Sequence, residues 1–104
     1  MKIILEKGWN EVIIKDDCDF ETFYKVANFL ENEFKIEFSR KLNDLDSIYW
    51  DFIYKKQELT LYYNIYLGIS IFPTAFKEAS VLANEMVIEI SRLLIDKIDN
   101  WDNF

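Results

Sequence analysis

The chain has 104 residues, of which 51% are hydrophobic and 30% are charged, a composition typical of a single folded domain. Its net charge of −7 argues against binding to nucleic-acid phosphates and to anionic membrane surfaces. Cys18 is the only cysteine, so no intramolecular disulfide is possible and we expect a reducing, cytoplasmic location. The chain turns polar after Leu5 and has no apolar run of bilayer length, so we expect neither a signal peptide nor a transmembrane helix.

Two β-rich stretches begin the chain, at residues 2–6 and 11–15. Gly8 lies between them and predicts a hairpin, because glycine adopts a positive φ angle without strain. Trp9 follows the turn, and we expect its side chain to pack across the two strands.

An amphipathic helix is predicted over residues 20–34, where apolar side chains recur at intervals of three and four. We expect Asp17 or Asp19 to cap this helix, because a carboxylate there accepts the unpaired amide hydrogens of the first turn. Residues 35–39 fit either a short strand or an extended exit from the helix. Residues 40–46 either form a loop or lengthen that strand so that it makes a hairpin with the next one.

Three consecutive antiparallel strands are predicted between residues 47 and 73. Because successive side chains of a strand point to opposite faces, Trp50 and Phe52 share one face, which we expect to join the core. Short polar turns separate the strands, and Pro73 ends the last one because it has no N–H to donate to a neighbour.

A long final helix is predicted to begin at Thr74 as its N-cap. Its wide apolar face contains Ala75, Ala79, Leu82, Ala83, Met86, Ile90, Leu93 and Leu94. Val81, Ile88 and Ile95 lie off this face at intervals of seven. Either the helix is buried on more than one side, or these three residues form a second apolar ridge that meets a partner.

The predicted elements follow the order β-β-α-(β)-β-β-β-α and indicate one α+β domain, residues 1–104. We expect an antiparallel sheet of about five strands, with both helices packed on one face because each helix has one broad apolar side. The other face of the sheet then meets solvent or a partner.

No residue pattern points to catalysis or to a bound cofactor. The chain has no histidine, the commonest general base, and its two glycines cannot build a phosphate-binding loop. Cys18 lies among aspartates, which disfavour its thiolate, and the same acidic run lacks the glycine and final glutamate of a calcium loop. We therefore expect a protein that is not an enzyme and holds no metal or cofactor.

The candidate binding site is an aromatic and acidic surface on the outer side of the predicted sheet. Large rigid side chains are typical anchors of protein interfaces, and carboxylates attract and pair with a basic partner. The expected anchors are Tyr49, Ile53, Tyr62 and Tyr66, and the expected acidic residues are Asp44, Asp46, Asp51 and Glu58. The alternative is that the tyrosines only cover the outer face of the sheet.

A tyrosine-rich stretch, LTLYYNIYLGISIFP, leads into the final helix of this short acidic chain without a catalytic motif. In these features the chain resembles the small acidic immunity proteins of bacterial toxin–immunity systems, including contact-dependent inhibition. The resemblance implies an inhibitor that binds one cognate toxin, often a basic nuclease, and blocks its active site or another necessary surface. These proteins differ in fold, so the resemblance assigns no binding residues.

Two other functions remain open from the sequence. A self-associating structural domain would form a homodimer through Val81, Ile88 and Ile95 or through the aromatic sheet face. A small-molecule-binding domain would use a pocket between the sheet and the helices, without the histidine or glycine loops that such sites often use.

Overall fold

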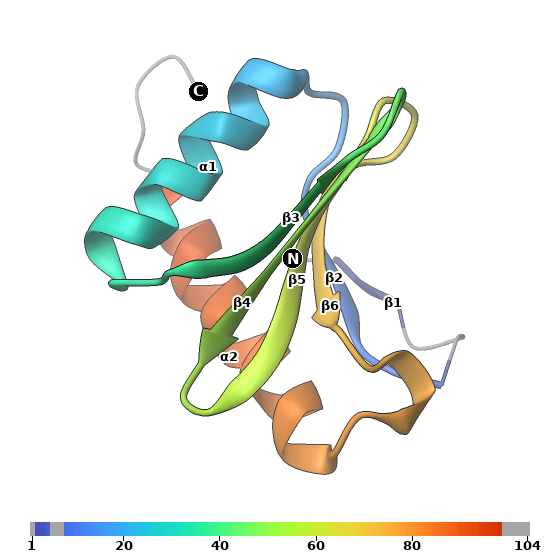
Figure 1. The fold of residues 1–104 in the computed structure, drawn as a ribbon, viewed down its shortest axis with the longest axis vertical. Helices are drawn as coiled ribbons and strands as arrows, with labels where there is room; N and C mark the ends of the chain where they lie inside the picture. Colours follow the sequence, from blue (N-terminus) through green and yellow to red (C-terminus); the bar gives the residue numbers. More distant parts are fainter. Residues whose placement is uncertain (1, 5–7, 99–104) are drawn as a thin grey trace.

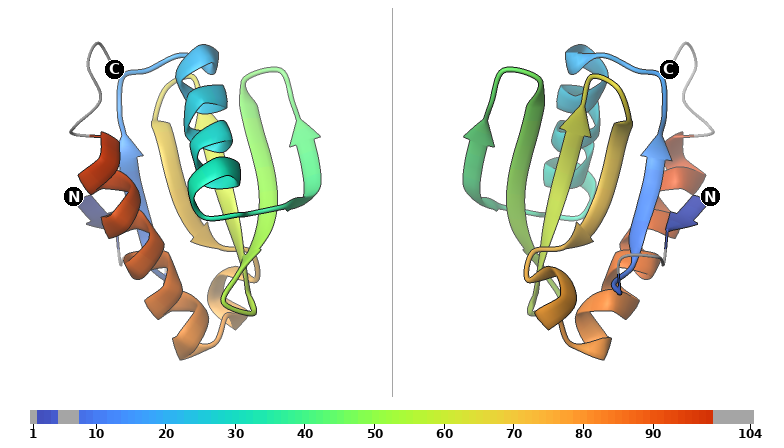
Figure 2. Two further views of the ribbon diagram at one scale, coloured as in Figure 1. Left: turned by 90° about the vertical axis from the view of Figure 1, so that its left-hand side faces the viewer. Right: turned by 90° about the vertical axis from the view of Figure 1, so that its right-hand side faces the viewer.

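The computed structural model describes residues 2–4 and 8–98 of the chain. Within them lie a six-stranded antiparallel sheet and two α-helices, which pack against the same face of the sheet (Figure 1 and Figure 2). The strands pair in the order β1-β2-β6-β5-β4-β3. The bounds are β1 Lys2–Ile4, β2 Glu11–Lys15, α1 Phe20–Glu33, β3 Phe38–Asn43, β4 Ser47–Tyr54, β5 Gln57–Asn64, β6 Gly68–Pro73, the 3-10 helix η1 Phe76–Glu78 and α2 Val81–Ile98.

The predicted α+β domain is confirmed, with six strands where about five were expected. β1 and β2 pair as predicted, although residues 5 and 6 of the first predicted strand lie outside the described residues. Of the alternatives for residues 35–46, the hairpin is correct. β3 pairs with β4 so that Leu42 lies opposite Tyr49.

The core lies between the sheet and the helices, as the alternation along the strands predicts. Trp50 and Phe52 are buried on the helix-covered face of β4. The ring of Phe23 in α1 lies 5.1 Å from that of Trp50 and 6.3 Å from that of Tyr63. The apolar helix residues with no exposed surface are Phe23, Val26, Leu30, Val87, Ile90 and Leu94. Burial of each such large side chain contributes roughly 1.5–3 kcal/mol, so this layer supplies most of the apolar stabilisation.

The predicted cap of α1 is also confirmed, with Asp19 in that position. Its Oδ1 accepts hydrogen bonds from the backbone N–H and from the hydroxyl of Thr22, each at 2.9 Å. These bonds hold the pKa of the Asp19 carboxyl below its ordinary value. After the helix, Lys35 has a φ angle of 56°, and this left-handed residue turns the chain towards β3.

α2 does not begin at Thr74, so the predicted N-cap is wrong. Residues 74–80 form a strap that contains η1 and leads from the end of β6 round to the helix side of the sheet (Figure 2). Ser80 caps α2 instead, because its Oγ accepts the backbone N–H of Ala83 at 3.0 Å. Thr74 does not cap the helix, because the chain must first pass the end of the sheet. The Thr74 hydroxyl instead forms a hydrogen bond with the Thr60 hydroxyl at 2.8 Å.

The buried stripe of α2 differs from the predicted apolar face. The helix residues that the core buries are Ala83, Val87, Ile90, Ser91, Leu94 and Ile98. Leu82 and Leu93 were expected on this face but are 48% and 43% exposed, whereas Ile88 and Ile95 pack against the core. Among the described residues, no helix is both long and apolar enough to cross a membrane.

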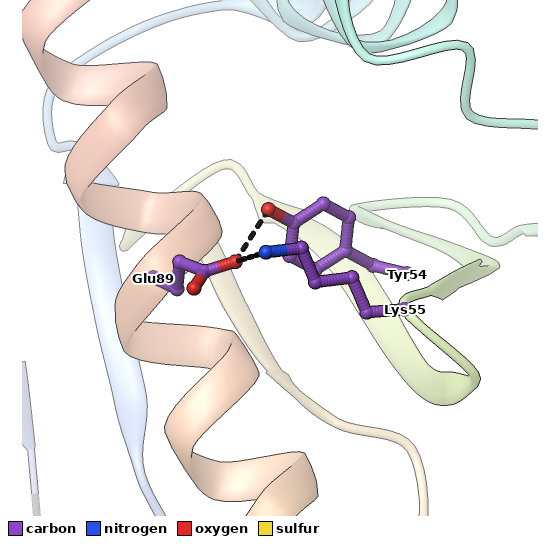
Figure 3. A network of polar contacts seen from close by, with 3 residues as sticks. All are labelled: Tyr54, Lys55 and Glu89. Carbon is purple, nitrogen blue, oxygen red and sulfur yellow. Dashed lines mark hydrogen bonds and ion pairs between the residues drawn. The ribbon is translucent and has the colours of Figure 1, made fainter.

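A polar network ties α2 to the β4–β5 turn (Figure 3). The Glu89 carboxylate accepts a hydrogen bond from the Tyr54 hydroxyl at 2.6 Å and pairs with the Lys55 Nζ at 2.7 Å. The turn has two consecutive left-handed residues, Lys55 and Lys56, with φ angles of 47° and 69°. A two-residue hairpin needs this conformation, which asparagine and glycine adopt more easily than lysine. The contacts of Glu89 therefore help to hold Lys55 and Lys56 in a left-handed conformation that lysine side chains disfavour.

This network gives a testable dependence of stability on pH. Burial and the adjacent Glu89 raise the pKa of Tyr54 from 10.0 to about 12. The folded protein holds the phenol proton more tightly than the unfolded chain, so this stabilisation is complete below pH 10.0 and is lost as the pH rises to about 12. We expect the difference in unfolding free energy between wild type and Tyr54→Phe, measured in urea, to shrink over that range. The same shrinkage with the exposed control Tyr66→Phe would contradict this assignment.

Gly8 and Gly68 form a matched pair, because their φ angles are 87° and 88°. A Cβ atom on Gly8 would have nothing within 4 Å, whereas on Gly68 it would meet the Lys15 carbonyl oxygen and lie 2.7 Å from the Asp16 Cα. We expect Gly8→Ala to cost about 1–2 kcal/mol for the left-handed backbone alone. Gly68→Ala should cost about 1–3 kcal/mol more, because two backbones must separate. Equal costs in urea unfolding would contradict the close approach.

Candidate functional site

The eight residues predicted to bind a partner fall into three groups on the molecule. The groups are Asp44, Asp46 and Tyr66 in turns at one end of the sheet; Tyr49, Asp51 and Tyr62 in the middle of the face opposite the helices; and Ile53 with Glu58 towards the other end. The first and third groups are exposed, whereas the middle group is partly or fully buried. The face opposite the helices is called the open face below.

The first group belongs to a tip where two turns meet. The β3–β4 turn spans residues 44–46 and the β5–β6 turn spans residues 65–67, and Figure 1 shows them side by side. The backbone N–H of Ile65 donates to the Asp46 carbonyl at 3.1 Å, so the two hairpins are joined at their ends. These two turns, together with residues 16–17, are called the acidic tip.

The most exposed large side chains of the acidic tip are Leu45 at 96%, Tyr66 at 80% and Leu67 at 57%. Their backbones are nevertheless held in place. The N–H of Leu45 donates to the Asp44 Oδ1 at 2.8 Å, and the N–H of Tyr66 donates to the Asn64 Oδ1 at 2.8 Å. Because the backbone is already ordered, a partner could bury these side chains at a small further cost in entropy.

Four exposed carboxylates lie at the same end of the sheet as these side chains. Asp44 and Asp46 are exposed in the first turn, and Asp16 and Asp17 are exposed just after β2. The end of β2 belongs to the same region, because Gly68 packs closely on the backbone of Asp16. The fields of four carboxylates add at this end of the sheet and attract a positively charged surface.

Five aromatic rings form a row across the open face, called the aromatic row. The centroid distances are 4.8 Å for Tyr49–Tyr62, 5.6 Å for Tyr62–Phe72, 5.3 Å for Phe72–Phe76 and 5.2 Å for Phe76–Trp9. Trp9, which we expected to pack across its own hairpin, contacts the strap. Tyr49 and Tyr62 are half-buried and Phe72 is buried, so the rings cover much of this face themselves. Burial also raises the pKa of the Tyr62 hydroxyl.

Asp51 is only 8% exposed and supports the open face from within. The Thr60 hydroxyl donates to its Oδ1 at 2.7 Å. Since that hydroxyl has one hydrogen, its 2.8 Å contact with Thr74 is an acceptance from the Thr74 hydroxyl. Arg40 lies opposite Asp51 in the strand register. Asp51 is therefore a buried hydrogen-bond acceptor, in a different setting from the exposed steering charge that we expected.

Two cavities of about 220 Å³ each lie along the aromatic row and share Tyr49, Phe72 and Phe76 as walls. The Asp51 cavity is completed by Arg40, Leu42, Asp51, Thr60 and Thr74. The Glu11 cavity is completed by Trp9, Glu11, Tyr62 and Leu67. Sites for drug-sized ligands occupy about 300–1,000 Å³, so each cavity suits one side chain better than a cofactor.

Ile53 and Glu58 do not belong to the acidic tip. They lie opposite each other in β4 and β5, near the turn at the far end of the sheet. Ile53 is 49% exposed and borders a depression of about 560 Å³. The other residues around this depression are Lys35, Glu37, Phe38 and Ser39.

Sequence reasoning missed Leu45, Leu67, Glu11 and Phe76 as parts of the site. The two leucines had a signal, because each is an apolar residue inside a predicted turn, where no core is available to bury it. Glu11 and Phe76 had none. Glu11 joins the site because β2 pairs with β6, and Phe76 joins it because the strap folds over that side of the sheet.

The apolar ridge proposed for self-association is incomplete, and the β3 edge of the sheet is poorly suited to pairing. Ile88 and Ile95 pack against the core, which leaves Val81 as the exposed member of the apolar ridge. The β3 edge of the sheet carries Arg40 and Lys41 and has a register shift near its start. Charged residues and bulges at an edge discourage pairing with the edge of another sheet.

The thiol of Cys18 is poorly suited to nucleophilic chemistry. Burial, with a smaller contribution from Asp19, raises its pKa to about 11, so it stays protonated near neutral pH. Over the described ranges, no three His, Cys, Asp or Glu side chains are grouped as metal ligands. What the described surface offers is a set of exposed apolar side chains, carboxylates and cavities of side-chain size.

Thr60→Val tests the polar support beneath the aromatic row. The change keeps the shape of the side chain but removes the donor to Asp51 and the acceptor for Thr74. We expect a loss of about 1–3 kcal/mol in unfolding free energy, because a buried acceptor loses its partner. Thr60→Ser keeps the hydroxyl and should cost clearly less. If Thr60→Val changes stability by less than about 0.5 kcal/mol, Asp51 does not depend on this bond.

Comparison with known proteins gives no match: neither a family model, nor a curated protein, nor a solved structure is similar to this chain. The acidic tip, the aromatic row and the two cavities are therefore the features of this chain that bear on its function.

Proposed function

We propose that the protein is a non-enzymatic binding module that docks a basic protein partner through its acidic tip. The carrying observation is the exposure of Leu45, Tyr66 and Leu67, at 96%, 80% and 57%, on turns that are hydrogen-bonded to each other. None of these side chains contributes to the core, so folding gives no reason for them to be large and apolar. Burial of these side chains by a partner would give such a reason.

Burial of the three anchors would supply affinity that does not depend on salt. Removing a large apolar side chain from water contributes roughly 1.5–3 kcal/mol, so the three together contribute on the order of 5 kcal/mol before the entropy cost of association. Tyr66 adds a rigid ring and a hydroxyl that can bond at the edge of the interface. Such a group of anchors suits the centre of a protein interface.

The charge of the tip selects the kind of partner. Asp16, Asp17, Asp44 and Asp46 are exposed at the same end of the sheet as the anchors, and the whole chain carries a net charge of −7. This field speeds the approach of a basic surface and opposes nucleic acids and anionic membranes. A basic protein with an apolar patch among its cations fits both parts of the tip.

Within this class, we propose an immunity protein that acts in the bacterial cytoplasm and neutralises a cognate toxin by direct binding. A toxin that cuts nucleic acid needs a basic surface to hold phosphates. An acidic inhibitor docked on that surface would block it without any chemistry of its own. The support is the combination of a small acidic domain with a tip of apolar anchors.

The tip can be tested with the toxin encoded beside this gene, using calorimetry. We expect Leu45→Ala combined with Tyr66→Ala to weaken binding by about 2–4 kcal/mol, because both anchors are truncated. Stability should change by less than about 0.5 kcal/mol, since both side chains are exposed. The matched control, Val81→Ala with Leu82→Ala, removes exposed apolar groups at the start of α2 and should leave the affinity unchanged.

Toxin binding that is unaffected by the tip variant, or lost equally in the α2 control, would contradict the proposal. Light scattering separates a second possibility. If the wild-type protein forms a dimer that Leu45→Ala with Tyr66→Ala dissociates, the tip is a surface for self-association.

A further inference from the structure

The Asp51 cavity brings a buried carboxylate and a cation together on the open face. Asp51 is 8% exposed, and the Thr60 hydroxyl donates to its Oδ1 at 2.7 Å. Within the described ranges, no other side chain forms a hydrogen bond or ion pair with this carboxylate. Arg40 lies opposite Asp51 on β3 and is exposed, and its guanidinium has no hydrogen bond or ion pair with another described residue. The cavity therefore offers a ligand both a hydrogen-bond acceptor and a hydrogen-bond donor.

A shift in the register of β3 directs Arg40 to this cavity. The pairing of β3 with β4 moves by one residue at Ser39, so that Arg40, and not Ser39, lies opposite Asp51. Such β-bulges re-aim the side chains that follow them. Lys41 consequently lies on the helix side of the sheet, where its Nζ is 4.3 Å from the centre of the Trp50 ring. One extra residue in the strand thus gives the cavity its cation.

These two groups favour a neutral polar ligand over a charged one. A cation attracted by Asp51 is repelled by Arg40, and an anion meets the same conflict in reverse. A carboxamide has no net charge, yet its N–H groups can donate to Asp51 and its oxygen can accept from Arg40. Hydrogen bonds with ionised groups are stronger than those between neutral groups, so both bonds favour the amide. The rings of Tyr49, Phe72 and Phe76 also line the cavity and offer flat surfaces to a planar group.

We propose that the Asp51 cavity receives a carboxamide side chain of the protein partner, from a glutamine or an asparagine. The cavity volume of about 220 Å³ suits one such side chain. That the side chain belongs to a protein partner rests on the proposed function, whereas the preference for an amide rests on the cavity alone. Leu42 lines the cavity, is 51% exposed, and precedes Asp44 of the acidic tip by two residues. A partner docked on the tip therefore lies next to the cavity.

The test is a nuclear magnetic resonance titration of the full chain with the peptide acetyl-Gly-Gln-Gly-amide. Two matched peptides carry glutamate or lysine in place of glutamine, so the backbone and terminal amides are the same in all three. We expect saturable shifts centred on Arg40 and Thr60, and the glutamine peptide should bind about tenfold more tightly than either control. A control that binds as tightly as the glutamine peptide, no saturable shift, or shifts centred on Trp9 and Leu67 would overturn the proposal.

Two neighbouring cations of β3 provide a variant and its control. Arg40→Ala changes an exposed residue and removes the donor to the amide oxygen. We expect it to weaken the glutamine peptide by about tenfold and to make the lysine peptide the tightest of the three, because Asp51 is then the one full charge in the cavity lining. Lys41→Ala removes a cation on the helix side and should leave all three affinities unchanged. A glutamine preference that survives Arg40→Ala, or is lost in Lys41→Ala, would contradict the assignment.

The cavity assignment and the proposed function can fail separately. Toxin binding that ignores Leu45→Ala with Tyr66→Ala would contradict the proposed function, and a glutamine preference in the peptide titration would still support the cavity assignment. Toxin binding that the tip variant weakens, without any glutamine preference among the peptides, would overturn the cavity assignment alone.

Discussion

Both helices pack on the same face of the sheet, and the rest of the molecule has to accommodate that asymmetry. α1 and α2 bury the layer that contains Trp50 and Phe52, so neither of these two α-helices excludes water from the open face. The strap partly takes over that role, because Phe76 stacks on Phe72 at 5.3 Å and Thr74 bonds Thr60. Aromatic rings and hydroxyl groups therefore cover this face of the sheet in place of a second layer of α-helices.

An open face of this kind combines rigidity with access. The Asp51–Thr60 and Glu11–Ser70 hydrogen bonds satisfy polar groups that lie under the rings, at 2.7 Å and 2.9 Å. Because these bonds are internal, they hold the walls of the neighbouring cavities in place. A preformed cavity next to exposed anchors lowers the ordering cost that association would otherwise carry.

The architecture was largely predictable from local patterns, and the candidate site was not. Alternation along β4 separates Tyr49 from Trp50, and the carboxylate before α1 marks its cap, because both signals depend only on near neighbours. Thr74 gave a local signal of the same kind, yet the path of the chain round the sheet overrode it. The burial of Asp51 depends on Thr60 in β5 and on Thr74 in the strap. The sequence of β4 alone could not predict these contacts, because both hydroxyl groups come from other parts of the chain.

The close approach of Gly68 to the backbone of Asp16 has a consequence for how this surface can diversify. The position of the β5–β6 turn is fixed by main-chain packing, which is indifferent to the side chains that the turn carries. Tyr66 in this turn is 80% exposed and can therefore be exchanged during evolution without disturbing the fold. Gly68 cannot be exchanged in this way, because a Cβ atom there would meet the backbone of Lys15 and Asp16. Related sequences with this framework could therefore vary the side chains of the β5–β6 turn while they keep the glycine at its end.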